Sequence, residues 1–150
     1  MSFVDAVRSI PEIAECLKAG LQALGSNSRK VEVRSTHDLA GSVDIDSCVA
    51  ANYPNEHRWD YIFGYKGHIY YVEVHPGTTG EVEVVIAKLN WLKQWCRRSA
   101  ERLEASQHGS SYHWISSGRT AITKNSKYSR ILVQNGISGP SSMLKADKFL

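Results

Sequence analysis

Five short stretches of the chain have the patterns of strands: apolar and polar residues alternate in the first two, and the others are mostly apolar runs. The stretches cover residues 30–35, 41–50, 59–65, 68–75 and 112–117. Over residues 3–24 and 81–103 the apolar positions instead recur every three or four residues, which predicts two amphipathic helices. The chain therefore begins with a helix, continues through four strands, and adds a long helix and one more strand.

A tight turn at Lys66 and Gly67 predicts that the strands on either side of it form a hairpin. In such a hairpin the numbers of paired residues sum to about 133 or 134, which places Asp60 opposite Glu73 or its neighbour. Glu73 and His75 lie two residues apart, so their side chains project from the same face of the strand. The sequence thus predicts two acids and an imidazole close together in the middle of a sheet.

The expected fold is of the α/β (α+β) class, with a central mixed sheet flanked by helices. A chain of 150 residues with 42% hydrophobic residues can bury one core of ordinary size, so we expect a single domain over residues 1–150. The predicted core covers about residues 3–116, and residues 117–150 are expected to form an irregular basic extension.

Cysteine usage and apolar runs limit the class of protein. Cys16, Cys48 and Cys96 are widely spaced and odd in number, which predicts small buried side chains and neither a disulfide framework nor a thiolate zinc site. No membrane span or signal peptide is expected, and the predicted location is the cytoplasm. The spacing of Trp91 and Trp95 indicates packing in a core or an interface, and the segment around Ser116 lacks the pattern of a serine hydrolase.

Basic residues accumulate toward the C-terminus of the chain. The formal net charge is +3, and the region from Ser111 onward carries six basic residues and one acid. Four of them, Arg119, Lys124, Lys127 and Arg130, are separated by Ser, Thr and Asn residues. They are either contacts for phosphate groups of a nucleic acid or part of a flexible, solubilising terminus.

Two buried carboxylates at close range are costly unless a cation, a proton or a basic partner lies between them. Asp60 and Glu73 therefore predict a site for magnesium or manganese, which bind hard oxygen ligands. In the alternative interpretation, Asp60 caps its strand or pairs with Arg58, and Glu73 lies on a solvated face. Asp44 and Asp46 either extend the acid cluster or mark the solvent side of an edge strand.

The order of helix, strand, Asp-bearing strand, Glu-x-His strand, helix and strand resembles the core of the PD-(D/E)XK, or restriction endonuclease-like, nuclease superfamily. The resemblance covers about residues 3–116. It implies that Asp60 and Glu73 bind a metal and that His75 stands where the motif has lysine. Lys88, on the following helix, is the candidate for a relocated lysine, and Glu12 or Glu15 would match an acid that some members contribute from the first helix.

The function implied by this resemblance is metal-dependent hydrolysis of phosphodiester bonds in nucleic acid. Asp60 and Glu73 would hold Mg²⁺ or Mn²⁺, and His75 would act as a general base or an additional ligand. The expected partner is nucleic acid, or a protein if the domain is inactive; lone nuclease domains of this size often work as dimers, so a homodimer is a candidate assembly. The alternative, which the missing lysine favours, is a catalytically inactive binding or adaptor domain of this fold, or an interaction protein whose acidic strand face and surface tryptophans contact another protein.

Overall fold

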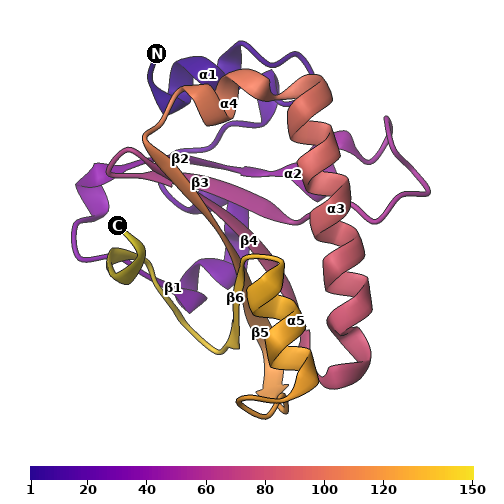
Figure 1. Ribbon diagram of the computed structural model, residues 1–150. Helices are drawn as coiled ribbons and strands as arrows, with labels where there is room; N and C mark the ends of the chain where they lie inside the picture. The colour runs from indigo at the N-terminus through magenta and orange to yellow at the C-terminus, as the bar shows by residue number, and fades with distance from the viewer.

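The computed structural model describes residues 1–150 and shows a mixed sheet with helices, an α+β fold (Figure 1). Five strands form the main sheet in the order β2-β3-β4-β5-β6. Their bounds are β2 Leu39–Asp44, β3 Tyr61–Tyr65, β4 His68–Gly77, β5 Gly109–Thr120 and β6 Ile137–Ser141. The first three strands are antiparallel, whereas β5 lies parallel to β4 and β6 lies parallel to β5. The sheet is therefore mixed, as the sequence predicted.

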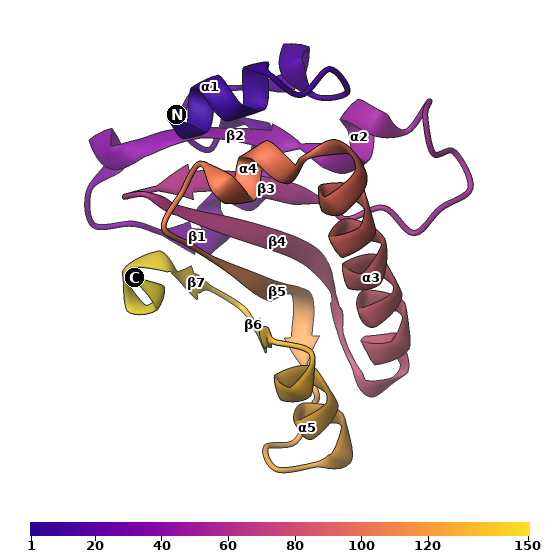
Figure 2. The same cartoon turned by 45° about the horizontal axis from the view of Figure 1, so that its top comes forward.

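Helices lie mainly on one face of the sheet, and short elements cover the other (Figure 2). The α-helices are α1 Phe3–Arg8, α2 Ile45–Val49, α3 Val82–Ser99, α4 Glu101–Ala105 and α5 Lys127–Gln134. A second sheet pairs β1 Val31–Glu32 with β7 Leu144–Lys145 in parallel. The 3₁₀ segments are Ala14–Cys16, Gln22–Lys30, Thr36–Asp38, Thr79–Glu81 and Ala146–Phe149.

The two faces of the main sheet bury separate apolar clusters. Tyr71 and Trp114 belong to the larger cluster, which also contains the buried residues of α1 and α3. Tyr70 and Val72 face the other way and pack with Leu144 and Ala146 from the C-terminal segment. Burial on both faces explains why β4 is almost continuously apolar, so a charged side chain in it must find a partner inside the protein.

The hairpin at the centre of the sheet has the predicted register. Tyr61 pairs with Val72 and Tyr65 pairs with His68, which are the partners that the predicted turn requires. Lys66 and Gly67 both have positive φ, the conformation that a two-residue type I′ turn needs. The positive φ of Gly67 is a conformation that residues with a side chain rarely adopt, so this position favours glycine.

The N-terminal third differs from the prediction. The apolar periodicity of residues 3–24 is split among α1, a 3₁₀ turn and the start of a second 3₁₀ segment, because Pro11 and Gly20 interrupt the helix. The strand expected over 30–35 contains only β1 and lies outside the main sheet. The strand expected over 41–50 ends at Asp44, whose carboxylate accepts the Ser47 N–H at 3.0 Å and caps α2.

The C-terminal region is not irregular, contrary to expectation. Residues 117–150 contain the end of β5, the helix α5 and the strands β6 and β7. Ser126 caps α5 by accepting the Ser129 N–H at 3.2 Å, and β6 then adds to the sheet beside β5. The Gly-, Ser- and Lys-rich composition gave no sign of these strands, because β6 is stabilised by pairing with β5 and β7 by pairing with β1, and periodicity does not report such pairing.

The prediction for the cysteines was wrong for two of the three. Cys16 and Cys48 form a disulfide across a Cα–Cα distance of 6.2 Å, although 32 positions separate them in sequence. Cys96 is free and buried, as predicted. A single disulfide between distant segments leaves no spacing signal in the sequence, because only the fold brings its two Cβ atoms within bonding range.

Candidate functional site

Asp60 and Glu73 lie opposite each other at the point where β3 begins. The Asp60 backbone N–H donates to Glu73 Oε1 at 3.1 Å, and the Val74 backbone N–H donates to Asp60 Oδ2 at 3.0 Å. Each carboxylate is thus held by the backbone of the other's segment, which fixes both side chains in place. One oxygen of each, Asp60 Oδ1 and Glu73 Oε2, is left to interact with the helix above.

Lys88 on α3 reaches both remaining oxygens. Its Nζ atom lies 2.5 Å from Glu73 Oε2 and 3.8 Å from Asp60 Oδ1. Glu73 is fully buried, whereas Asp60 and Lys88 are 18% and 17% exposed, so the group opens to solvent on the Asp60 and Lys88 side. Burial lowers the pKa of the Lys88 ammonium, but Glu73 and then Asp60 outweigh burial, and the net shift is upward. Lys88 therefore stays charged.

His75 lies between two carboxylates. Its Nδ1 is 3.5 Å from Glu73 Oε2, and its Nε2 is 2.8 Å from Glu81 Oε2 at the start of α3. The hydrogen bond to Glu73 raises the pKa of His75, and the one to Glu81 adds to it despite burial. This geometry favours the imidazolium, which donates from both nitrogens. A general base needs a free lone pair, so the arrangement suits a positioning cation better than the base role that the sequence suggested.

Burial and, after it, the nearby charge of Glu73 raise the pKa of Asp60, Lys88 acts in the opposite direction, and the net result is a pKa of about 7. A single ammonium group therefore does not fully compensate two acids at this depth. Around neutral pH this carboxyl gains and loses a proton readily, and added positive charge would hold it ionised.

Two carboxylate oxygens are the donors available here to a hard divalent cation, which would have to keep much of its water. Asp60 Oδ1 and Glu73 Oε2 are carboxylate oxygens, and magnesium sites commonly use one or two of these with water and substrate phosphate. No group of three or more His, Cys, Asp or Glu side chains is arranged to hold a metal ion. Binding also requires the Lys88 ammonium to give up its close contact with Glu73.

The backbone of Asp60 is fixed by α2. Its carbonyl accepts the N–H groups of Ile45 at 2.8 Å and Asp46 at 3.3 Å. Arg58 does not pair with Asp60 but donates from Nε to Asp46 Oδ1 at 2.8 Å. Asp44 therefore caps α2, and Asp46 binds Arg58. Neither carboxylate contacts Lys88.

Glu12 and Glu15, the acids expected from the first helix, lie outside α1 and outside this group. The Glu12 carboxylate accepts the Tyr53 hydroxyl at 2.6 Å and the Trp95 indole N–H at 2.8 Å. Burial is the largest single effect and raises the pKa of Glu12, but the hydrogen bonds from Tyr53 and Trp95, with smaller contributions from Ser99 and Arg98, outweigh it, so the net shift is downward. Glu12 thus connects the N-terminal segment to α3.

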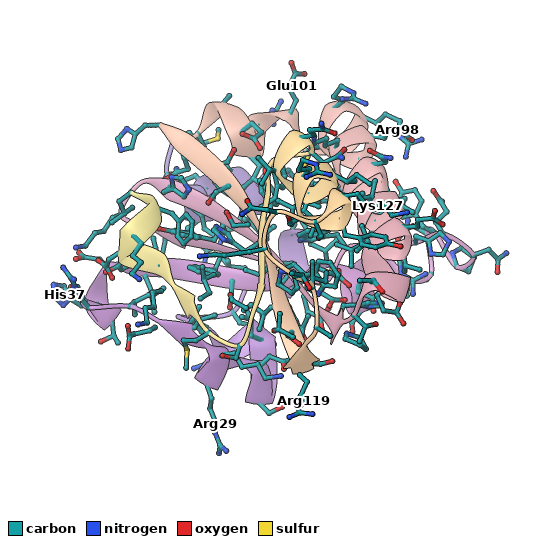
Figure 3. The ribbon with its side chains drawn as sticks, turned by 60° about the horizontal axis from the view of Figure 1, so that its bottom comes forward. Arg29, His37, Arg98, Glu101, Arg119 and Lys127 are labelled. Carbon is teal, nitrogen blue, oxygen red and sulfur yellow. A yellow bond between two sulfur atoms is a disulfide. The ribbon has the colours of Figure 1, made fainter.

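The four basic residues of the C-terminal region are exposed and form no ion pair or hydrogen bond with the Asp60, Glu73 and Lys88 group. Arg119 projects outward at the end of β5, and Lys127 lies on α5 (Figure 3). Their segment is nevertheless joined to the strand of the site, since Thr120 pairs with Gly77 and the Ala121 N–H donates to the Gly77 carbonyl at 2.9 Å. Arg130 donates to the Asn125 carbonyl at 2.7 Å, which closes the loop before α5.

One participant was not singled out from sequence. Glu81 follows His75 by six residues and reaches back to it only because the loop after β4 turns sharply into α3. An acid at the start of a helix is ordinarily explained by the helix dipole, so the sequence offers no separate signal for this contact.

No model of a protein family, no curated protein and no solved structure matches this chain. The helices are also too short or too polar for any of them to cross a membrane. A functional assignment therefore rests on the chemistry of the site and on the order of the elements.

Proposed function

We propose that this protein is a metal-dependent, nuclease-like domain of the PD-(D/E)XK type that hydrolyses phosphodiester bonds. The observation that carries the proposal is the position of Lys88 Nζ, which contacts Glu73 and Asp60 from a helix that follows both. Two acids on neighbouring strands and one ammonium are the groups that the resemblance requires, with the lysine supplied by α3. Such a charged group inside an apolar sheet is expensive to maintain and is typical of a functional site.

The order of the elements supports the same proposal. The chain runs through α1, β2, β3, β4, α3 and β5, with the acids at the start of β3 and within β4. The three antiparallel strands are followed by a helix and a strand parallel to β4. This succession of helix, three strands, helix and strand is the one on which the resemblance rests.

Asp60 and Glu73 are the residues that would hold magnesium or manganese. The ion, when bound, supplies a Lewis acid for the phosphoryl oxygen and lowers the pKa of a bound water. Lys88 offsets negative charge that develops on the phosphate. His75 orients Glu73 through its Nδ1 atom, and Glu81 holds the ring from the other side.

Nucleic acid is the proposed substrate because exposed basic side chains flank the strand that carries the site. Arg119 lies on the strand extension that pairs with Gly77, two residues beyond His75. Lys124, Lys127 and Arg130 follow on the adjoining loop and on α5. These side chains would contact phosphate groups and position the backbone without reading bases.

A second candidate is a nucleic-acid-binding domain of the same fold without turnover. The close contact between Lys88 and Glu73 favours it, because an ammonium that already neutralises the acids competes with a metal ion. Both candidates bind nucleic acid but differ in metal binding, so metal binding is the measurement that separates them.

The test combines cleavage with metal-dependent melting. Plasmid DNA, single-stranded DNA and RNA are incubated with the protein and Mg²⁺ or Mn²⁺, beside Glu73→Gln and the exposed control Glu83→Gln. We expect cleavage by the wild type and Glu83→Gln and a loss of at least about a hundredfold in Glu73→Gln. Millimolar Mn²⁺ should raise the melting temperature of the same two proteins but not of Glu73→Gln, because a ligand of the folded state stabilises it.

Equal cleavage by all three proteins would refute the assignment. Nucleic-acid binding without cleavage and without a response to metal would support the second candidate.

A further inference from the structure

The Cys16–Cys48 disulfide lies at the surface beside an open pocket. Cys16 belongs to the 3₁₀ turn Ala14–Cys16, and Cys48 belongs to α2. Both cysteines are partly exposed and line a pocket of about 410 Å³ with polar neighbours that include Glu15, Lys18 and Asp44. A small dithiol can therefore reach the sulfur atoms, whereas the third cysteine, Cys96, is buried.

The helix that carries Cys48 is also the element that fixes Asp60. The N–H groups of Ile45 and Asp46 at the start of α2 donate to the Asp60 carbonyl, and Asp46 holds Arg58. A helix of five residues is too short to be stable by itself, so α2 depends on its attachments. Besides these hydrogen bonds, its attachments include the buried side chains of Ile45 and Val49 and the disulfide bond to Cys16.

We propose that the Cys16–Cys48 disulfide is a redox-sensitive tether that sets how firmly α2 holds Asp60. The reductant is a dithiol. One of its thiolates attacks a cysteine sulfur, the S–S bond breaks, and its electron pair leaves on the other cysteine as a thiolate, which takes up a proton. The second thiol of the reductant then resolves the mixed disulfide, so the protein gains two electrons and two protons while the dithiol becomes a disulfide.

Reduction loosens α2 but does not unfold the protein. Ile45 and Val49 stay in the core, and the Tyr53 hydroxyl still holds Glu12. What is lost is the cross-link between segments 32 positions apart, which limited the motion of α2 and of the loop from 50 to 60. The consequence for catalysis rests on the proposed function, because it assumes that Asp60 holds the metal ion.

The primary experiment measures amide hydrogen exchange of the full chain, oxidised and after treatment with dithiothreitol. We expect exchange in peptides spanning residues 45–60 to accelerate by roughly tenfold or more on reduction, while peptides of β4 and β5 stay protected. The Cys16→Ser/Cys48→Ser protein should exchange like the reduced wild type and ignore dithiothreitol. Cys96→Ser should respond as the wild type does, which shows that the effect belongs to the disulfide.

A second measurement reports the link to Asp60. After reductant is removed without oxygen, the stabilisation by Mn²⁺ should be smaller in the reduced protein than in the oxidised one. Exchange over 45–60 that is equal in the two states would overturn the tether. If exchange responds but Mn²⁺ stabilises neither state, the tether stands and the proposed function fails, so the two failures are distinguishable.

Discussion

Two buried polar clusters occupy opposite faces of the same sheet. They differ in how their polar groups are compensated, one by ion pairs and the other by neutral hydrogen bonds. On the α3 side, Glu73 is neutralised by Lys88 and His75. On the other side, His68 Nε2 and His113 Nε2 lie 2.8 and 2.6 Å from Ser111 Oγ, beneath Tyr70 and Phe149. The first cluster is charged, whereas the second is neutral around pH 7, because burial lowers the pKa of both histidines.

The two histidines in these clusters show the difference directly. Hydrogen bonds to Glu73 and Glu81 raise the pKa of His75, whereas burial lowers that of His113 to about 4, with a smaller effect of His68. Both rings sit on the central strands, so the presence or absence of a carboxylate decides the direction. Burying two like charges lowers the stability of the folded protein, and a bound cation can offset this loss. A neutral cluster contributes only packing and hydrogen bonds.

Removing the ammonium should have the largest effect on stability. Lys88→Met leaves Glu73 buried without its principal partner, and we expect a loss of about 3 to 5 kcal/mol in the free energy of unfolding. Urea denaturation at pH 7 measures it. Lys93→Met is the matched control on the same helix, because Lys93 lies over the Tyr112 ring without an acid partner, and it should cost less than about 1 kcal/mol. Similar losses in both variants would show that Glu73 does not depend on Lys88.

Removing one acid should stabilise the protein while it abolishes activity. Asp60→Asn keeps an oxygen for the Val74 N–H and removes a charge whose pKa is raised to about 7, so at pH 8 we expect a gain of about 2 to 4 kcal/mol. Thermal or urea unfolding measures the gain, and cleavage assays measure the loss. Asp38→Asn, at an exposed position, should change stability by less than about 0.5 kcal/mol. A destabilised Asp60→Asn protein would contradict the expectation that the charge of Asp60 destabilises the folded state.

The pH dependence of stability should separate the clusters. Asp60 has a raised pKa, so its contribution is full below about 4 and is lost as pH rises toward 7. His113 has a lowered pKa, so its contribution is present above 6.5 and is lost, by about 3 kcal/mol at most, as pH falls toward 4. The two slopes oppose each other in the wild type.

Substitution of one residue at a time should reveal how the other changes the free energy of unfolding with pH, measured by urea denaturation from pH 4 to 7. His113→Gln should show stability that falls with rising pH, and Asp60→Asn should show stability that rises. His37→Gln, at an exposed position, should follow the wild type. Parallel profiles in all four proteins would mean that neither cluster titrates within this range.

The smallest effect should come from the neutral side. The Tyr70 hydroxyl donates to the Ala146 carbonyl at 2.6 Å, and Tyr70→Phe removes this bond while keeping the ring stack with Phe63. We expect a loss of about 1 kcal/mol, measured by urea denaturation, with no change in metal response. A loss of stability as large as that of Lys88→Met would contradict the expectation that the neutral cluster contributes less than the charged one.

The predictable parts of this protein are those with local signals. The hairpin register followed from the turn at Lys66 and Gly67, and with it the pairing of Asp60 and Glu73. Lys88 was a candidate only because the resemblance allowed a relocated lysine. Its contact with both acids required knowing how α3 crosses the sheet, because the direction of a helix over a strand is set by packing at many positions.

By itself, the sequence determined the mixed α+β architecture, the strands of the central hairpin and the proximity of Asp60 and Glu73, because alternation and turns act over a few residues. Only the tertiary structure decided the pairing of Cys16 with Cys48, the role of α2 beneath Asp60, the strands β6 and β7, and the reach of Glu81 to His75. Each of these joins segments whose separation along the chain carries no periodic signal, and loop closure and packing of the whole domain bring them into contact.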